Sequence, residues 1–325
     1  MGGNLAEEKS IKRCAAIDIG TNTVLLLVAD ISGDTLNPVY EAQLIPRLGK
    51  GVDASRNIAP DAVQRVADAV NQHLEDIEQQ FESMPVTITA TSAVRDARNR
   101  QEVLDQLYHQ TGYKIRLLSG DDEAHLTFKG ALTMVDHYDE NAVVLDIGGG
   151  STEIIAGVPD DIKFARSLDI GCVRFSERYL PSLPADEQAI YDCAMAVRNT
   201  IAENNIRFSG FGSQFIGVAG TVTSLAAIFQ ELEGYDAKLI NNVQLSSSQI
   251  EAFARKVLSM NVREIEQLNP AVMKGRADIF PAGLLILTEV MRYGYFRMLK
   301  VSTGGLRHGV LMESNAHQAN ESIAT

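Results

Sequence analysis

Two similar segments, at residues 16–23 and 145–153, constrain the fold of this chain more than any other feature. In each, an apolar run ends in Asp and Gly, continues through small hydroxyl or amide residues, and leads into a second apolar run. This pattern predicts two strands joined by a tight hairpin. Glycine lets the backbone approach an anion closely, and hydroxyl and free N–H groups donate hydrogen bonds to its oxygens. The repetition therefore indicates two related lobes that close on one phosphorylated ligand.

Length and composition indicate an ordinary globular protein of two domains. With 325 residues the chain exceeds the usual limit of one hydrophobic core, and it is 45% hydrophobic and 22% charged. The longest apolar runs are too short to span a membrane, and residues 1–15 lack the apolar core of a signal peptide. Three scattered cysteines fit neither a disulfide framework nor a zinc site. We therefore expect a cytoplasmic protein with reduced thiols and no membrane partner.

The net charge of −13 argues against broad nucleic-acid binding, which requires a basic surface. The same charge is unfavourable for a polyphosphorylated ligand, so basic residues must converge locally if such a ligand binds. The candidates are Arg95, Arg98, Arg100, Lys129, Arg174, Lys274, Arg276 and Arg307.

The expected elements alternate as in an α/β protein. Strands are predicted at residues 14–18, 24–31, 39–45, 86–91, 114–118, 142–146, 153–158, 162–168, 215–219 and 301–303. Helices are predicted at residues 60–81, 101–111, 120–131, 185–204, 246–265, 277–295 and from 306 onward. We expect an N-terminal lobe over residues 1–135 and a C-terminal lobe over 136–305. A final helix at about 306–325 is expected to pack back on the N-terminal lobe.

Three acidic residues of the two hairpins are candidate metal ligands. Asp18 and Asp146 each end an apolar strand, where an unpaired carboxylate would be costly. Turn formation alone can explain an Asp-x-Gly sequence, but the recurrence of the full pattern favours a metal ion or an ordered water. Glu153 lies on the returning strand, where it is either a surface residue or a second ligand beside Asp146. Carboxylate oxygens at a phosphate site suit Mg²⁺, which usually keeps several waters.

Further candidate anion sites follow other predicted strands. Glycine-rich turns occupy residues 217–224 and 302–309. Arg95 follows the strand at 86–91, where it is either a phosphate clamp or a solvated side chain. The acidic segment 119–124 begins a helix, and its spacing alone is explained by helix capping. His308 is treated as structural.

Taken in order, these segments resemble the exopolyphosphatase / guanosine pentaphosphate phosphohydrolase (Ppx/GppA) family. The matching pieces are DIGTNT at 18–23, TSAVRDARN at 91–99, SGDDEA at 119–124, DIGGGSTE at 146–153, GCVRF at 171–175, AGTVTS at 219–224 and GGLRHGV at 304–310. DIGGG alone would indicate only the wider superfamily of sugar kinases, heat-shock ATPases and actin. The resemblance implies two ribonuclease-H-like lobes with an active site in the cleft between them. It also implies the short form of the family, without the C-terminal helical domain of longer relatives.

The resemblance assigns roles to individual residues. It implies that Glu123 is the general base, that Arg95 contacts phosphate, and that Asp146 and Glu153 hold Mg²⁺ or another divalent cation. From the hairpins, the glycine-rich turns and the candidate basic residues, the expected phosphate-binding residues are Asp18, Gly20, Thr21, Asn22, Thr23, Gly148, Gly149, Gly150, Ser151, Thr152, Gly220, Thr221, Arg276 and Arg307. Many relatives have a second glutamate at the position of Asp122, so this chain departs mildly from the family pattern there.

The reaction that the resemblance implies is release of the terminal phosphate of inorganic polyphosphate by in-line attack of water. Guanosine pentaphosphate is the alternative substrate, since the site chemistry would be the same. A kinase of the same superfamily is another possibility, although an acid placed like Glu123 suits water activation. A sensor that binds guanosine tetraphosphate without turnover is disfavoured by the presence of Glu123, Asp146 and Glu153. We also expect a homodimer.

Overall fold

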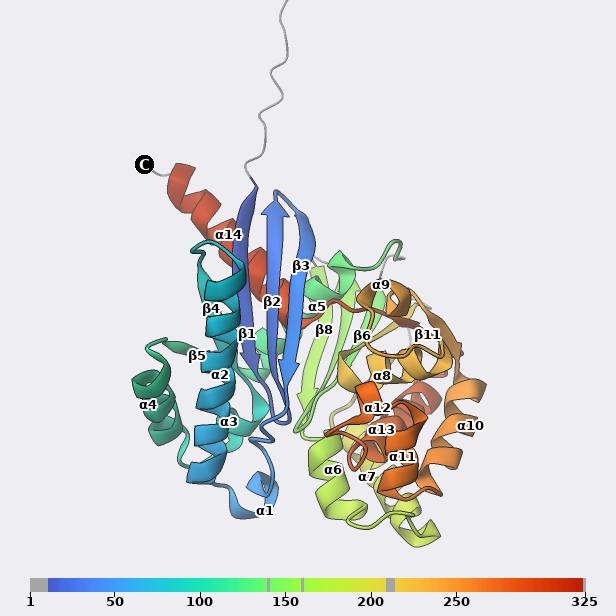
Figure 1. The fold of residues 1–325 in the computed structure, drawn as a ribbon. Coiled ribbons are helices and arrows are strands. Elements are labelled where there is room, and N and C mark those ends of the chain that lie inside the picture. The colour runs from blue at the N-terminus through green and yellow to red at the C-terminus, as the bar shows by residue number, and fades with distance from the viewer. Residues whose placement is uncertain (1–10, 139–140, 159–160, 209–213, 324–325) are drawn as a thin grey trace, which may run out of the picture.

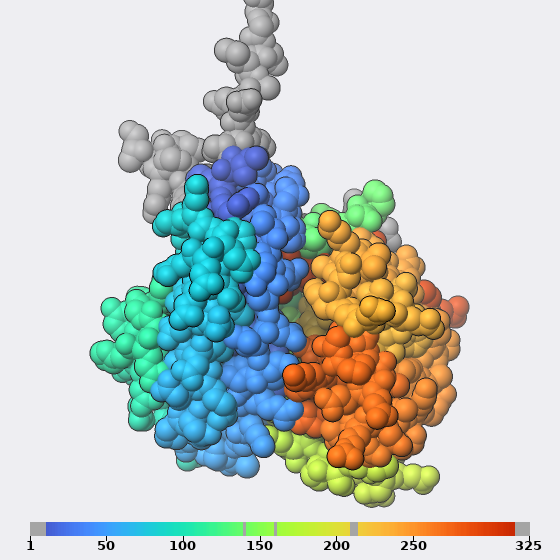
Figure 2. All heavy atoms as spheres, in the orientation of Figure 1, coloured from blue at the N-terminus to red at the C-terminus, as the bar shows by residue number. Residues whose placement is uncertain are grey.

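The computed structural model describes residues 11–138, 141–158, 161–208 and 214–323, and it consists of two α/β lobes (Figure 1). In Figure 2 the N-terminal lobe, in blue and cyan, faces the C-terminal lobe, in yellow and orange, across a hollow. Within the described residues, no helix is long and apolar enough to cross a membrane.

The two sheets repeat one strand order. The first has the order β3-β2-β1-β4-β5, with β1 (Lys12–Ile19), β2 (Val24–Ser32), β3 (Thr35–Leu44), β4 (Val86–Ala90) and β5 (Ile115–Leu117). The second has the order β10-β11-β9-β6-β7-β8, with β6 (Ala142–Ile147), β7 (Thr152–Val158), β8 (Asp161–Leu168), β9 (Phe215–Val218), β10 (Gln244–Ser246) and β11 (Met298–Val301). In each sheet three antiparallel strands are extended by two parallel ones, and the second sheet has a sixth strand, β10, antiparallel to β11. This order confirms the predicted α/β class and its two ribonuclease-H-like lobes.

Helices cover the faces of both sheets. Those that follow the strands of the first sheet are α1 (Val52–Ser55), α2 (Pro60–Gln80), α3 (Ser92–Asp96), α4 (Arg100–Thr111) and α5 (Gly120–Thr133). Those of the second half are α6 (Cys172–Tyr179), α7 (Glu187–Glu203), α8 (Ala219–Phe229), α9 (Ala237–Ile240), α10 (Ser247–Leu258), α11 (Val262–Leu268), α12 (Pro270–Met273) and α13 (Phe280–Tyr293). The last helix is α14 (Leu306–Ile323).

Successive side chains of the strands in the first lobe point to opposite faces of the sheet, so each face has its own hydrophobic core. Helix α2 begins at Pro60, whose fixed φ suits the first turn of a helix and whose missing N–H is not needed there. Its apolar face, which includes Val63 and Val66, packs against Ile17 and Ile19 on one side of the sheet.

Helix α14 covers the opposite side of the first sheet. Leu306 and Val310 lie in one cluster with Ala16 of β1 and Leu27 of β2, and Figure 1 shows α14 (red) behind these strands. The described part of the last helix therefore packs on the N-terminal lobe, while residues 324 and 325 lie outside the described residues.

Helix α5 contributes to the cores of both lobes. Its Leu126 belongs to the cluster with α14 and the first sheet, whereas Phe128 packs with Val144 and Ile216 of the second sheet. The other face of the second sheet, with Leu145, is covered by α7, α8, α10 and α13. Since α5 touches both sheets, its position depends on how the two lobes meet.

The crossing of α5 and α14 depends on glycine, because a Cβ atom at Gly309 would lie 1.9 Å from the backbone oxygen of Leu126. We expect Gly309→Ala to lower the free energy of unfolding by about 1–3 kcal/mol, as overpacked sites do. Gly305→Ala is the matched control, since a Cβ atom there meets no atom within 4 Å. Urea unfolding checks both variants, and equal stability of the two would contradict the expected close packing.

Most predicted elements are present, but the prediction of one long helix is wrong. The helix predicted at 246–265 is interrupted between Leu258 and Val262. Asn261 accepts a hydrogen bond from the N–H of Glu264, whose side chain accepts one from the N–H of Asn261, so a new helix begins there. The predicted strand at 301–303 ends at Val301, and the short helices α1, α3, α6, α9 and α12 are not predicted from sequence.

Candidate active site

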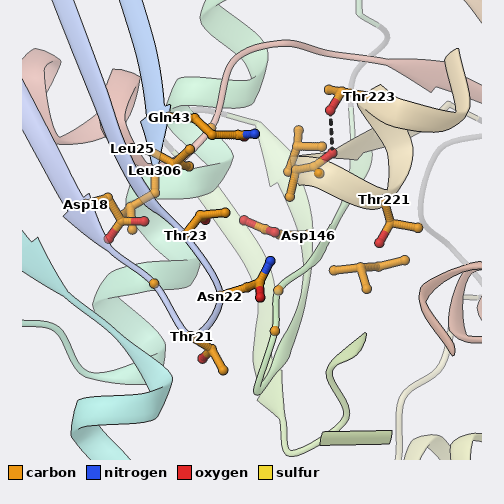
Figure 3. A pocket seen from close by; sticks show the side chains of 18 of the residues that line it. Asp18, Thr21, Asn22, Thr23, Leu25, Gln43, Asp146, Thr221, Thr223 and Leu306 are labelled. Atoms are coloured by element: carbon orange, nitrogen blue, oxygen red, sulfur yellow. Dashed lines mark hydrogen bonds between the residues drawn. The ribbon is translucent and has the colours of Figure 1, made fainter. Parts of the chain in front are cut away.

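All four glycine-rich segments singled out in the sequence line one cavity between the lobes. The cavity has a volume of about 490 Å³. Its walls include the β1–β2 and β6–β7 hairpins, the start of α8 and the segment that leads into α14. Figure 3 shows Asp18, Asn22 and Thr23 of the first lobe facing the cavity opposite Asp146 and Thr221 of the second.

The two hairpins are closed by equivalent hydrogen bonds. The N–H of Gly20 donates to the oxygen of Thr23 at 2.9 Å, and the N–H of Gly148 donates to the oxygen of Ser151 at 3.0 Å. The strand pairs end at Ile19 opposite Val24 and at Ile147 opposite Thr152. The backbone geometry thus repeats the sequence pattern.

Glycine also allows the two hairpins to touch. A Cβ atom at Gly149 would lie 2.7 Å from the Thr21 side chain, and one at Gly150 would lie 2.3 Å from Ser92 Oγ. The sequence suggested only that these glycines let the backbone approach an anion. Their contacts show that they also set how closely the second hairpin packs against the first lobe.

Four carboxylates lie near one another at the hairpins. Those of Asp18, Glu123 and Glu153 are buried, and that of Asp146 is half-buried in the cavity wall. Asp146 stands directly opposite Glu153 in the β6–β7 ladder, as the hairpin pattern predicts. Ser167 Oγ donates to Glu153 Oε1 at 2.6 Å, and Thr89 Oγ1 donates to Asp18 Oδ1 at 3.2 Å.

Burial and mutual repulsion favour the protonated forms of these acids. Burial first, and then the charge of Glu123, raise the pKa of both Asp18 and Asp146 to about 7. The pKa of Glu153 is raised well above its usual value by burial and by the charges of Glu123 and Asp146. A positive charge placed among these acids would therefore reduce the electrostatic repulsion between them when they are ionised.

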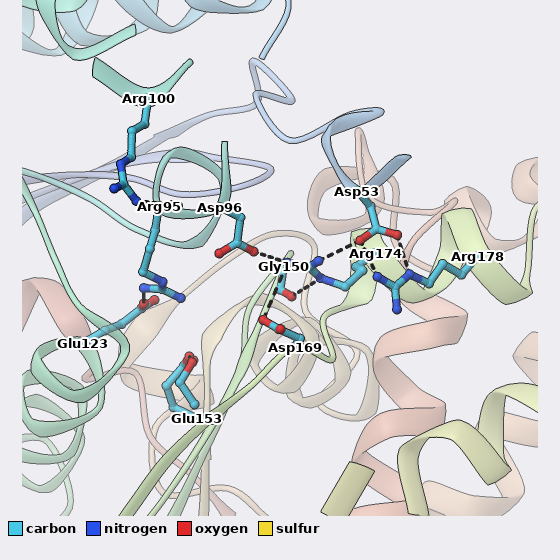
Figure 4. Close-up of polar contacts among 11 residues, drawn as sticks. Asp53, Arg95, Asp96, Arg100, Glu123, Gly150, Glu153, Asp169, Arg174 and Arg178 are labelled. Atoms are coloured by element: carbon cyan, nitrogen blue, oxygen red, sulfur yellow. Dashed lines mark hydrogen bonds and ion pairs between the residues drawn. The ribbon is translucent and has the colours of Figure 1, made fainter. Parts of the chain in front are cut away.

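Arg95 pairs with Glu123. Its Nη1 donates to Glu123 Oε2 at 2.6 Å (Figure 4). Burial raises the pKa of Glu123, and the charge of Arg95 opposes that rise. The resemblance implied that Arg95 contacts phosphate, whereas in this structure its guanidinium holds the carboxylate implied as the general base.

These pKa shifts predict how stability depends on pH in the metal-free protein. The carboxyl group of Asp18 has a pKa of about 7 when folded and about 3.9 when unfolded, so the folded state binds more protons between these values. The contribution of Asp18 to stability therefore decreases as pH rises from about 4 to about 7. We expect the free energy of unfolding of Asp18→Asn, relative to that of wild type, to increase by about 1–3 kcal/mol as the pH is raised from 4.5 to 8.

Urea unfolding in EDTA at several pH values measures this difference, and the comparison with wild type cancels the titration of groups that do not interact with Asp18. Asp34→Asn is a suitable control, because Asp34 lies in the exposed turn between β2 and β3. A difference that is constant with pH would contradict the raised pKa of Asp18.

Positive charge is concentrated at another part of the cavity wall. Arg276 donates to Gly220 O at 3.3 Å, to Ser224 Oγ at 3.1 Å and to Gln43 Oε1 at 2.7 Å. All three partners are neutral, and its buried Nε has no hydrogen-bond partner among the described residues. Arg307, by contrast, is paired with Glu41 at 3.0 Å. Arg276 is therefore a buried cation whose charge these neutral contacts do not balance.

The structure brings most of the predicted site residues together. Those that line the cavity are Asp18, Gly20, Thr21, Asn22, Thr23, Glu123, Asp146, Gly148, Gly149, Gly150, Ser151, Gly220, Thr221, Arg276 and Arg307. Arg95 and Glu153 lie behind the wall, in contact with or close to Glu123.

Other candidates lie elsewhere. The hydroxyl of Thr152 is buried and donates to the carbonyl oxygen of Ile170, so it is not available to a ligand in the cavity. Lys129 and Lys274 are exposed and do not line the cavity. Arg174 is buried in ion pairs with Asp53 and Asp96.

Sequence reasoning missed several residues of the wall. Glu41 and Gln43 reach it from edge strand β3, and Ser92 from the first turn of α3. The alternation of polar residues on β3 was the available signal for the first two. Tyr235 and Phe280 carried no motif.

Asp146 and Glu153 are suited to hold a divalent cation. Their oxygens are hard donors, and the repulsion among the clustered carboxylates favours a cation beside them. Within the described residues no group of three or more His, Cys, Asp or Glu side chains has the geometry of a metal site. Two carboxylates nevertheless fit Mg²⁺, which is usually bound by one or two carboxylates together with waters and substrate phosphates.

Two α/β lobes that present matching Asp-Gly hairpins to one cavity define a member of the actin-like superfamily. The profile of the Ppx/GppA phosphatase family matches residues 27–318, and the chain belongs to this family. It is therefore an enzyme of the phosphatase class, as the ordered motifs predict.

Similar proteins cover nearly the whole chain. Exopolyphosphatase 2 of Mycobacterium tuberculosis is 32% identical over 294 residues, which are 87% of this chain and 91% of that protein. The crystal structure of an exopolyphosphatase-like protein has a TM-score of 0.87 and 28% identity, and the match covers 94% of this chain and 98% of the other. The crystal structure of an exopolyphosphatase from Cytophaga hutchinsonii has a TM-score of 0.82 and 26% identity, with 92% and 96% covered.

Proposed function

We propose that this protein hydrolyses the terminal phosphoanhydride bond of inorganic polyphosphate. The observation that carries the proposal is the polarity of the cavity, which has buried carboxylates at the hairpins and the unbalanced Arg276 at another part of its wall. A chain of phosphates can place its reacting group at the hairpins and a following phosphate at Arg276. The name of the Mycobacterium tuberculosis relative, exopolyphosphatase 2, supports the same substrate.

Unpaired polar atoms in the cavity wall support a ligand with many hydrogen-bond acceptors. Four wall residues have a buried polar atom without a hydrogen-bond partner among the described residues: Ser92, Arg276, Thr303 and His308. Buried polar atoms in folded proteins nearly always have a partner, so such a group indicates a site that a ligand or water completes.

In the proposed mechanism the hairpins hold the terminal phosphoryl group. Backbone N–H groups and the hydroxyls of Thr21, Thr23 and Ser151 donate to its oxygens. Glu123 accepts a proton from the attacking water, and burial raises its pKa toward the range in which a carboxylate is an effective base at neutral pH. Arg95 opposes the rise in the pKa of Glu123 and holds its carboxylate in place. A divalent cation, when bound at Asp146 and Glu153, would supply positive charge beside the phosphoryl oxygens.

Phosphate release from short polyphosphate, long polyphosphate and guanosine pentaphosphate, measured side by side, tests the proposal. We expect release from polyphosphate. Binding without release for all three substrates would instead support a sensor, and transfer of phosphate to an added hydroxyl acceptor would support a kinase.

Guanosine pentaphosphate is the second candidate substrate, and the apolar part of the wall favours it. Tyr235, Val272 and Phe280 line the cavity together with Arg276. An inorganic chain makes no use of such a surface, whereas a nucleoside could pack against it. Faster release from guanosine pentaphosphate than from either polyphosphate would identify it as the better substrate.

Arg276 is expected to bind substrate phosphate. Replacement by Gln should raise KM by about 10–100-fold, because a buried hydrogen bond to a charged group contributes about 1.5–3 kcal/mol. It should also make the dependence of log affinity on log salt less steep, since one fewer phosphate is neutralised.

The control is Lys129→Gln, which removes one positive charge from an exposed position outside the cavity. An equal change of slope in both variants would mean that net charge, rather than contact with the substrate, determines the salt dependence.

A further inference from the structure

Arg174 joins three elements from both lobes. From α6 of the C-terminal lobe, its Nη1 donates to Asp53 Oδ1 of α1 at 2.7 Å, and its Nη2 pairs with Asp96 of α3. Its Nε donates to the carbonyl oxygen of Gly150, in the second hairpin, at 2.7 Å. The side chain is only 6% exposed, so these contacts are largely shielded from solvent (Figure 4).

Asp96 connects this contact to the proposed reaction. Helix α3 has only five residues, and Arg95 directly precedes Asp96 within it. Arg95 in turn holds Glu123 at 2.6 Å. A displacement of α3 would therefore move the cation that keeps the proposed general base in place.

Stability alone does not account for this arrangement. A buried ion pair pays a large desolvation cost, and such pairs often contribute little to net stability. A guanidinium whose Nε, Nη1 and Nη2 all donate hydrogen bonds does fix the relative positions of its acceptors, because the directions of its donors are rigid. The hydrogen-bond partners of Arg174 lie in the second hairpin, in α1 and in α3, the helix that carries Arg95. A further carboxylate, that of the exposed Asp169, lies 4.0 Å from its Nη2.

We propose that Arg174 is a positioning residue that couples closure of the lobes to the placement of Arg95 beside Glu123. When the second hairpin packs against the first lobe, Arg174 binds both Gly150 and Asp96 and so fixes the position of α3. This inference rests on the proposed function, in which Glu123 activates water.

The main test is Arg174→Met, which keeps an extended side chain but removes all three contacts. We expect kcat for phosphate release to fall by about 10–100-fold, the cost of a small misplacement in an active site. KM should change by less than about threefold, because no hairpin N–H group or cavity arginine is removed. A loss confined to KM, or no loss at all, would overturn the proposal.

Arg178→Gln is the matched control. Arg178 lies on the same helix and pairs with Asp53, but it has no contact with Asp96 or Gly150. It should retain kcat within about threefold of wild type, even if it loses as much stability as Arg174→Met. An equal fall of kcat in both variants would mean that Arg174 acts only by holding the lobes together.

The double variant Arg95→Ala, Arg174→Met tests the route of the effect. If Arg174 acts through Arg95, its replacement should cause little further loss of kcat once Arg95 is absent. Fully multiplicative losses would contradict that route.

Hydrogen exchange gives a reading that does not depend on activity. Amide protons of residues 92–98 should exchange faster in Arg174→Met than in wild type, by about tenfold or more, and at the wild-type rate in Arg178→Gln. Unchanged exchange in Arg174→Met would overturn the inference. Faster exchange in a protein that hydrolyses none of the three substrates would leave the positioning of α3 established and refute the proposed function.

Discussion

Replacement of Glu123 by Gln is expected to lower kcat by about 10²–10⁴-fold while substrate affinity stays close to that of wild type. This is the usual cost of losing a general base. Glutamine keeps the size of the side chain and can still orient a water molecule, but it cannot accept the proton. The measurement is phosphate release under saturating substrate, together with binding of the same substrate to the variant.

The structure adds a reason to expect this effect at Glu123 rather than at its neighbours. Its side chain is mostly buried at the cavity and paired with Arg95, whereas Asp122 is exposed and accepts a hydrogen bond from Ser119 at the start of α5. Asp122→Asn is therefore the matched control and should retain most of the activity. Full activity of Glu123→Gln would return Glu123 to the role of helix capping that its spacing alone suggests.

The parts of the fold that were predicted from sequence depend on local patterns. Both hairpins join two apolar runs through a glycine turn, and the structure closes them with equivalent hydrogen bonds. The pairing of Asp146 with Glu153 followed from their places on adjacent strands of one hairpin. Such features need only short-range geometry.

Features that depend on contacts between distant segments could not be predicted in the same way. The pairing of Arg95 with Glu123 requires α3 and α5 to meet, and the free charge of Arg276 is evident only when all of its neighbours are known. The break at Asn261 was missed for a different reason. Apolar spacing continued through it, and the capping box with Glu264 overrode that spacing.

Removal of divalent cations with EDTA is expected to abolish turnover, with a fall in rate of about 10²-fold or more. The reason is electrostatic, because the charge of Glu123 already acts on Asp18, Asp146 and Glu153, and ionised carboxylates at the hairpins would repel a phosphate brought to them. The fold should survive this treatment, since the cation is expected at a substrate site rather than within the core of either lobe. Added Mg²⁺ should restore the rate, and undiminished hydrolysis in EDTA would rule out the proposed metal site.

Variants of the two proposed ligands separate metal binding from the general effect of chelation. Asp146→Asn and Glu153→Gln should each raise the Mg²⁺ concentration for half-maximal activity by about 10–100-fold, since even residues that only orient a metal ligand have effects of this size. Asp136→Asn removes a carboxylate from an exposed position just before β6 and should not change the requirement. Asp146→Asn and Glu153→Gln also remove an acid whose pKa is raised in the folded state, so these metal-free variants should be more stable than wild type at pH 8. If a variant is more stable than wild type in EDTA but needs more Mg²⁺ for activity, its carboxylate is a metal ligand. If a variant loses activity at every Mg²⁺ concentration and is also less stable, the substitution acts through the fold.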